Sequence, residues 1–160
     1  MFPDHLIDLA EQVIRAYSKG NLKLATAESC TGGLIAGCLT AVSGASDVLT
    51  HGFITYANEA KMNLLGVPKS QLIKHGAVSE TVARSMAAGA LTKTTTIAVS
   101  VTGIAGPGGG SPEKPVGLVH IAVARTGAET RHERHVFTGE RAAVRLQTIE
   151  AALKMLLLAV

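Results

Sequence analysis

The sequence contains no tryptophan and only two tyrosines and three phenylalanines among its 160 residues. Hydrophobic residues nevertheless make up 47% of it, so its core must consist mainly of alanine, valine, leucine and isoleucine. That content, with a mean hydropathy of +0.30, excludes a disordered chain. Because domains typically run to about 100–200 residues, we expect residues 1–160 to form a single domain.

Cysteine is also scarce. Cys30 and Cys38 fall on one predicted helix, where a rise of about 1.5 Å per residue separates them too far for a disulfide. Reduced cysteines favour a cytoplasmic protein. The first residues resemble no signal peptide, and the apolar tail 155–160 is too short to span a bilayer. We therefore expect a cytoplasmic protein with no membrane partner.

Aspartate occurs only three times, and never beside the glycine-rich stretch 103–110. Magnesium-dependent phosphoryl transfer usually needs such a carboxylate, which argues against a kinase or ATPase.

The run His132–His135 is one residue shorter than the zinc-protease H-E-x-x-H, and on a strand its two histidines face opposite ways. We expect no metal site.

The 15 basic residues give a formal net charge of +3, which suits an anionic small ligand as well as nucleic acid. No basic patch interleaved with aromatic residues is present, however. We therefore expect a small-molecule partner and no nucleic acid.

The spacing of apolar residues predicts helices that alternate with strands. Helices are expected over 6–19, 31–41, 58–65, 79–91 and 139–158, with Asn58 and Ser79 as N-caps. Strands are expected over 22–27, 47–56, 97–101, 116–124 and 131–137, the last two as a hairpin. This order predicts an α/β fold, a three-layer α/β/α sandwich with a mixed, mainly parallel β-sheet.

The stretch Ala27–Gly33, "AESCTGG", lies where the first strand gives way to a helix. The N–H groups of such a turn converge at the positive end of the helix dipole and could hold an oxyanion beside Ser29 or Cys30. The alternative is structural, because serine is a preferred N-cap. The stretch on its own leaves both interpretations open.

A serine nucleophile needs a base. His51 or His120 could approach Ser29 on folding. Lys61 falls in the first turn of a predicted helix, where the dipole favours the neutral amine that a Ser–Lys hydrolase requires. The alternative for Lys61 is a solvated surface lysine. Tyr56 could relay or orient a proton, or could be a half-buried strand residue.

The loop Gly103–Gly110 follows a predicted strand, as many phosphate-binding loops do. It lacks the G-K-[ST] ending of a P-loop and is followed by prolines instead of a helix. Arg141 or Arg145 could supply the anion partner, or could lie on an exposed helix face.

Four stretches together, "AESCTGG", "YANEAKMNLLGV", "GAVSETVARSMA" and "VTGIAGPGGGSPEKPVGLVHIA", resemble the CinA C-terminal domain family. The resemblance covers about Leu6 to Leu158. This family includes stand-alone nicotinamide-nucleotide amidases, so the resemblance implies deamidation of nicotinamide mononucleotide to nicotinate mononucleotide and ammonia. It also implies a three-layer sandwich with a mixed sheet, and no metal or organic cofactor.

The resemblance further implies roles for single residues. Ser29 would be the nucleophile, Lys61 the general base and Tyr56 a proton relay or orienting group. The oxyanion and substrate would be held by Thr31, Gly32, Gly33, Thr102, Gly103, Gly106, Gly108 and Arg145.

Other interpretations stay open. The basic balance and the glycine-rich loop also fit a non-catalytic nucleotide-binding module, or a competence- or DNA-damage-linked accessory module. An amidase or esterase acting on another substrate is a third option. A homodimer is an open possibility.

Overall fold

The computed structural model describes residues 1–160, and its five strands form one sheet in the order β2-β1-β3-β4-β5. The strands are β1 (Leu24–Glu28), β2 (Leu49–Ile54), β3 (Ile97–Gly103), β4 (Leu118–Arg125) and β5 (Arg131–Val136). Strands β2, β1 and β3 are parallel, while β4 runs antiparallel to both of its neighbours. Four of the five strands therefore point the same way, which confirms the predicted mixed, mainly parallel sheet.

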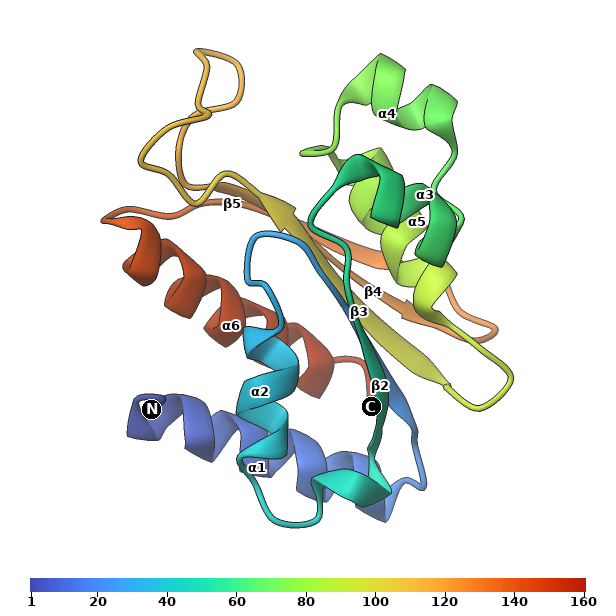
Figure 1. Ribbon diagram of the computed structural model, residues 1–160. Coiled ribbons are helices and arrows are strands. Elements are labelled where there is room, and N and C mark those ends of the chain that lie inside the picture. Colours follow the sequence, from blue (N-terminus) through green and yellow to red (C-terminus); the bar gives the residue numbers. More distant parts are fainter.

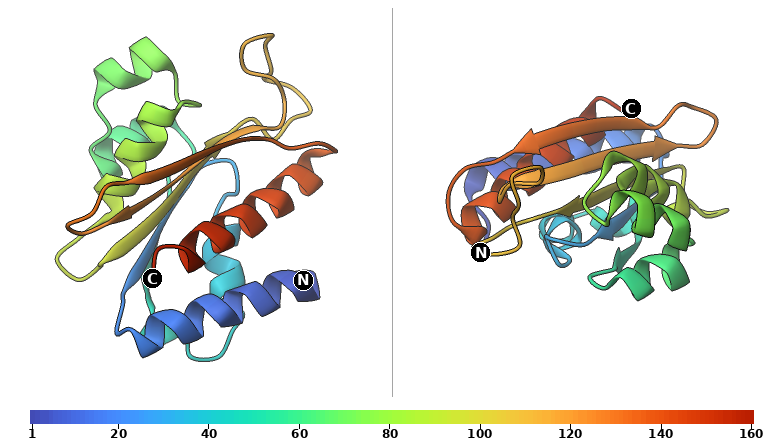
Figure 2. Two further views of the ribbon diagram at one scale, coloured as in Figure 1. Left: turned by 180° about the vertical axis from the view of Figure 1, so that it is seen from behind. Right: turned by 90° about the horizontal axis from the view of Figure 1, so that it is seen from above.

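Helices cover both faces of this sheet (Figures 1 and 2). The helices are α1 (Asp4–Lys19), α2 (Leu34–Thr40), α3 (Asn58–Leu65), α4 (Lys69–His75), α5 (Glu80–Ala90) and α6 (Arg141–Leu157). Helices α1, α2 and α6 lie on one face and α3, α4 and α5 on the other, so the predicted three-layer sandwich is confirmed. No helix has both the length and the apolar character that crossing a bilayer requires.

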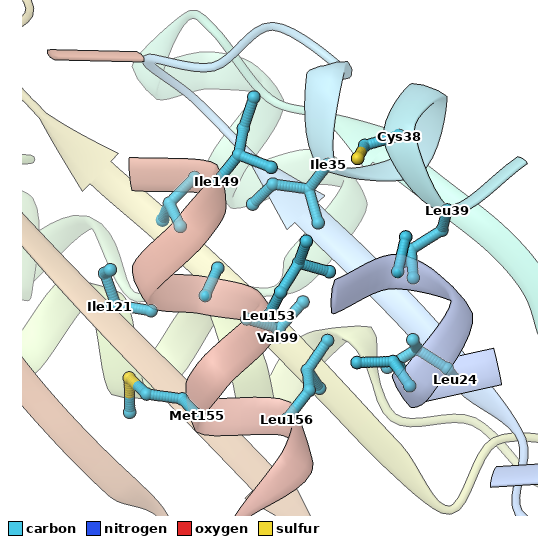
Figure 3. Packing of buried hydrophobic residues seen from close by; sticks show 14 of the residues in the cluster. Leu24, Ile35, Cys38, Leu39, Val99, Ile121, Ile149, Leu153, Met155 and Leu156 are labelled. Carbon is cyan, nitrogen blue, oxygen red and sulfur yellow. The ribbon is translucent and has the colours of Figure 1, made fainter. Parts of the chain in front are cut away.

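The two faces of the sheet carry side chains of different size. The face toward α1, α2 and α6 is built from valine, isoleucine and leucine, and Figure 3 shows Val99 beside Leu153 of α6. The face toward α5 carries the alanines Ala25, Ala27, Ala98, Ala122 and Ala124. Side chains alternate between the two faces along each strand, so large aliphatic residues fill a thick core on one side of the sheet. The alanines on the other side let α5 approach the sheet closely.

Three local expectations need correction. Helix α2 begins at Leu34 and not at residue 31, because Gly32 and Gly33 adopt positive φ angles of +63° and +96° and form a turn first. Asn58 does not cap α3, since Ala57 holds the cap position without a side-chain bond. Helix α4 was not expected from the sequence.

The connections that follow β1 and β2 lie on opposite faces of the sheet. The connection from β1 to β2 passes through α2 on one face, and that from β2 to β3 passes through α3, α4 and α5 on the other. In open α/β sheets, ligands bind at the carboxyl ends of the strands where such connections diverge. The residues that follow β1 are therefore placed for a functional site.

Gly89 in α5 gives a test of the close contact between α5 and the end of α3. A Cβ at this position would lie 1.9 Å from the carbonyl oxygen of Leu65 at the end of α3, so Gly89→Ala should lower the free energy of unfolding by about 1–3 kcal/mol. Gly37→Ala is the matched control, since its Cβ would meet only Phe2 at 3.6 Å. That change should stabilise by up to about 1 kcal/mol, the usual helix effect. Equal effects of the two changes in urea denaturation would contradict the packing argument.

Candidate active site

Ser29 lies directly after β1, held between the two neighbouring strands. Its N–H donates to the Val101 carbonyl of β3 at 3.0 Å. On the other side, the Thr55 N–H donates to the Glu28 carbonyl at 2.8 Å. The backbone of Ser29 is therefore fixed from both sides, and its side chain is nearly buried.

Lys61, in the first turn of α3, points its amine at this serine. Its side chain is buried, and Nζ lies 3.1 Å from Ser29 Oγ, 2.8 Å from the Thr55 carbonyl and 3.3 Å from the Tyr56 carbonyl. No carboxylate forms an ion pair with it. Burial without a countercharge lowers the pKa of Lys61 below its usual 10.5.

The contacts of Lys61 match the bonding capacity of a neutral amine. A neutral amine has two N–H donors, which the Thr55 and Tyr56 carbonyls accept, and one lone pair. The third neighbour is the Ser29 hydroxyl, which can donate to that lone pair. The arrangement can therefore take a proton from Ser29.

The thiol of Cys30, the other candidate nucleophile, is held in its protonated form. This thiol is buried, and desolvation raises its pKa to about 11. The thiolate is the reactive form of cysteine, and burial in apolar surroundings leaves the thiol inert. The geometry therefore favours Ser29 over Cys30.

A small cavity of about 210 Å³ opens at the Ser29–Lys61 pair. Its wall includes Thr102, Gly103 and Arg141 as well as the pair itself. A larger hollow of about 640 Å³ also has Arg141 in its wall, together with Arg145. Arg141 therefore lines both spaces.

Tyr56 lines the same small cavity as Ser29 and Lys61, but its hydroxyl makes no hydrogen bond with either of them. It is 60% exposed, and its hydroxyl accepts a hydrogen bond from Arg141 Nη2 at 2.8 Å. Arg141 Nη1 also donates to the Gly106 carbonyl at 2.9 Å. The hydrogen bond of Tyr56 with Lys61 is made by its backbone carbonyl, whereas its hydroxyl contacts Arg141. A role of this hydroxyl in relaying a proton stays a prediction.

Three of the expected oxyanion donors already have acceptors. The Gly32 N–H donates to the Ser29 carbonyl at 3.1 Å, and the Gly33 N–H to Glu28 Oε2 at 3.1 Å. The Thr102 hydroxyl donates to the Ala77 carbonyl at 2.9 Å. In this structure the hydrogens of these three groups are committed to protein acceptors, and their role in binding the oxyanion stays a prediction.

Two N–H groups of the same turn remain free. Those of Cys30 and Thr31 donate to no protein acceptor. Arg145 Nη2 donates to the Thr31 carbonyl at 2.8 Å, so this arginine holds the turn as well as lining the hollow. Gly108 lies exposed in the glycine-rich loop and lines neither space.

The sequence interpretation missed Glu28, which packs its carboxylate against the start of α2. An acidic residue shortly before a helix is a recognisable signal, because carboxylates are stabilised by the N-terminal N–H groups.

No cluster of three or more His, Cys, Asp or Glu side chains is placed to hold a metal ion.

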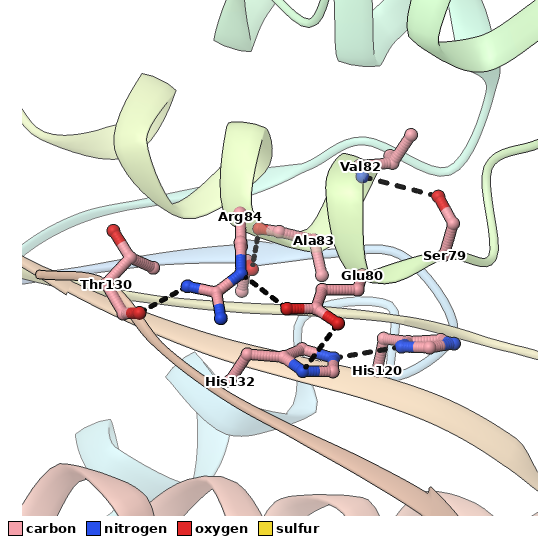
Figure 4. Close-up of polar contacts among 9 residues, drawn as sticks. Ser79, Glu80, Val82, Ala83, Arg84, His120, Thr130 and His132 are labelled. Carbon is pink, nitrogen blue, oxygen red and sulfur yellow. Dashed lines mark hydrogen bonds and ion pairs between the residues drawn. The ribbon is translucent and has the colours of Figure 1, made fainter. Parts of the chain in front are cut away.

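The histidines considered as bases make contacts of their own. His120 Nδ1 lies 2.9 Å from His132 Nε2, and His132 lies 3.6 Å from Glu80, which pairs with Arg84 (Figure 4). His51 bonds with the neighbouring Thr50 hydroxyl at 2.9 Å. Neither His51 nor His120 makes a hydrogen bond with Ser29, so Lys61 is the only base in contact with it.

The chain is thus an α/β sandwich with a buried serine–lysine pair at the carboxyl end of β1. Residues 6–160 match the CinA C-terminal domain family, and the chain belongs to this family. It is 46% identical over 157 residues to the nicotinamide-nucleotide amidohydrolase PncC of Escherichia coli K12, covering 98% of this chain and 95% of that protein.

A solved structure of the competence/damage inducible protein CihA from Agrobacterium tumefaciens is also similar. It is 47% identical, with a TM-score of 0.96 over 99% of this chain and 97% of that one. A putative competence-damage inducible protein of Caldicellulosiruptor bescii is 54% identical over 150 residues and 92% of this chain. The chain spans only 36% of the length of that longer relative.

The histidine pair predicts how stability depends on pH. Burial is the main cause that lowers the pKa of His120 to about 4, and the neighbouring His132 and Arg134 lower it further. Burial also lowers the pKa of His132. The Glu80 carboxylate opposes both shifts. A histidine in the unfolded chain titrates near 6.5. Between about pH 6.5 and 4 the unfolded state therefore binds more protons, so the free energy of unfolding should fall as the pH falls through this window.

Urea denaturation at several pH values measures this effect. His120→Gln should flatten the decline between about pH 6.5 and 4, whereas exposed His75→Gln should keep the wild-type slope. Parallel curves for wild type and His120→Gln would contradict the role given to the pair.

Proposed function

We propose that the chain is an amidohydrolase that converts nicotinamide mononucleotide to nicotinate mononucleotide and ammonia through a Ser29–Lys61 dyad. The observation that carries this proposal is the 3.1 Å contact between Ser29 Oγ and the buried Lys61 amine. The printed activity of the E. coli relative, 46% identical over nearly the whole of both chains, supports the reaction and the substrate.

In the first half of the reaction, Lys61 takes the hydroxyl proton as Ser29 Oγ attacks the carboxamide carbon. A C–O bond forms and the carbonyl oxygen becomes negative. The tetrahedral intermediate then collapses with cleavage of the C–N bond, and Lys61 returns the proton to the leaving ammonia. The product of this half is a nicotinoyl ester on Ser29.

In the second half, water attacks that ester. Lys61, neutral again, removes a proton from the water, and the same proton is then given back to Ser29 Oγ as the ester bond breaks. Nicotinate mononucleotide leaves, and the dyad is restored without a metal or an organic cofactor.

The negative oxygen needs hydrogen-bond donors that are already in place. We assign this role to the N–H groups of Cys30 and Thr31, because they have no protein acceptor and directly follow the nucleophile in the chain. Gly103 contributes to the wall of the cavity that would hold the pyridine ring.

The rest of the nucleotide would extend into the larger hollow. Arg141 and Arg145 line it, and guanidinium groups bind phosphate through paired N–H donors. Tyr56 then acts through Arg141, whose guanidinium its hydroxyl contacts. The glycine-rich loop takes part through the Gly106 carbonyl, which fixes the other side of Arg141.

Substitutions at the two adjacent candidate nucleophiles test the assignment. Ser29→Ala should lower ammonia release from nicotinamide mononucleotide by at least about 10³-fold, because it removes the attacking oxygen. Cys30→Ala, the matched control, should keep turnover within about threefold, since the buried thiol is unreactive and an alanine keeps the backbone N–H. The measurement is ammonia release together with chromatography of the nucleotide product.

Other outcomes point elsewhere. Activity that survives in Ser29→Ala and is lost in Cys30→Ala would overturn the dyad. Tight nucleotide binding by the wild type in calorimetry, without any turnover, would favour the non-catalytic module instead.

A further inference from the structure

The Glu28 carboxylate is buried next to the nucleophile without a cationic partner. Its side chain has no exposed surface, and no lysine, arginine or histidine forms an ion pair with it. A charge in this position is costly unless hydrogen bonds compensate for it. The contacts of Glu28 show what compensates.

Four donors converge on the two carboxylate oxygens. Oε2 accepts from the Thr31 hydroxyl at 2.6 Å, from the Gly33 N–H at 3.1 Å and from the Ile35 N–H at 2.9 Å. Oε1 accepts from the Ala36 N–H at 2.9 Å. Three of these donors are backbone groups at the start of α2, so the N-terminus of this helix is satisfied by the protein itself.

This capping decides which N–H groups of the turn remain for a substrate. The helix N-terminus points at Glu28, and the residues between Glu28 and Leu34 must form a separate turn. Gly32 and Gly33 make that turn possible with positive φ angles. The N–H groups left without an acceptor are those of Cys30 and Thr31.

Thr31 is fixed at two points, its hydroxyl and its carbonyl. Its hydroxyl donates to Glu28, and its carbonyl accepts from Arg145 Nη2 at 2.8 Å. The residue is fully buried. With hydroxyl and carbonyl both held, the direction of the Thr31 N–H is set before any substrate arrives.

We propose that Glu28 is a positioning residue for the amide hydrolysis, and that its carboxylate aims the Cys30 and Thr31 N–H groups at the oxyanion. This inference rests on the proposed function, because it needs Ser29 as the nucleophile. Glu28 itself does not touch the substrate; it acts through Thr31 and the start of α2. Preorganised donors of this kind are valuable because they need no reorganisation as the charge develops.

The donor set requires a carboxylate in particular. All four partners are donors, so a carboxylate with two acceptor oxygens satisfies them. The amide of glutamine has nearly the same shape but presents one oxygen and one NH₂ group. Its NH₂ group would face either the Ala36 N–H or the three donors now on Oε2.

The experiment is steady-state kinetics of Glu28→Gln on nicotinamide mononucleotide, with Glu59→Gln as the matched control. Loss of one oxyanion donor typically lowers kcat by about 10²–10³-fold, and we expect a loss of that size in Glu28→Gln with KM changed by less than about threefold. Glu59 is exposed in the first turn of α3, and its substitution should leave both constants unchanged.

The dependence of kcat on pH separates positioning from general damage. In Glu28→Gln the inflection that reports Lys61 should stay where it is in the wild type, because the Lys61 contacts do not involve Glu28. Unchanged kcat in folded Glu28→Gln would overturn the inference. So would a loss of kcat accompanied by a displaced inflection or an equally large rise in KM.

A milder variant covers the case in which Glu28→Gln does not fold. Thr31→Val keeps the size of the side chain and removes only its bond to Glu28, and it should lower kcat by about tenfold with KM little changed. Wild-type kcat in Thr31→Val would overturn the inference. Ser29→Ala, measured alongside, distinguishes the failures: if it stays active the proposed function itself is wrong, whereas an inactive Ser29→Ala with normal kcat in the other variants removes only the role of Glu28.

Discussion

The burial of the Lys61 amine without a countercharge is the constraint on which the account of the site depends. A charged ammonium in this position would need compensation that two carbonyls and a hydroxyl supply only in part. The neutral amine fits the same three neighbours with its two donors and one lone pair. Burial therefore lowers the pKa of the lysine and, by the same contacts, turns its lone pair toward Ser29.

The sheet supplies the backbone groups that make this burial possible. Thr55 and Tyr56 follow β2, and Ser29 follows β1, so their positions are set by parallel pairing of adjacent strands. Helix α3 brings Lys61 over that edge, while α2 leaves from the opposite face. Because the two connections leave on opposite faces, the end of β1 stays uncovered, and the cavity beside Ser29 lies there.

Periodicity predicted the order of the elements, because strands buried on both faces and amphipathic helices leave clear patterns. It failed for α4, which is only seven residues long, has no buried residue and packs Leu72 alone against the core, so the pattern is too short to detect. At the site, residue type drew attention to Ser29 and Lys61. The sequence attributed the neutral amine to the helix dipole, whereas the structure attributes its lowered pKa mainly to burial.

Other features of the site lay beyond the sequence for physical reasons. The direction of the Tyr56 side chain depends on Arg141, which is 85 residues away along the chain. The carbonyls around Lys61 are backbone groups that no residue type reveals. The engagement of the Gly32 and Gly33 N–H groups became visible only once the helix was seen to begin at Leu34 with Glu28 against it.

The most direct test of the central claim is an NMR titration of the Lys61 side-chain amine in the free protein. Selective ¹⁵N labelling of lysine, with Lys61→Met to assign the resonance, gives the pKa of this amine separately from those of exposed lysines. We expect a pKa clearly below 10.5 for Lys61. A pKa at or above 10.5 would contradict the claim, because burial would then not favour the neutral amine that has to accept a proton from Ser29.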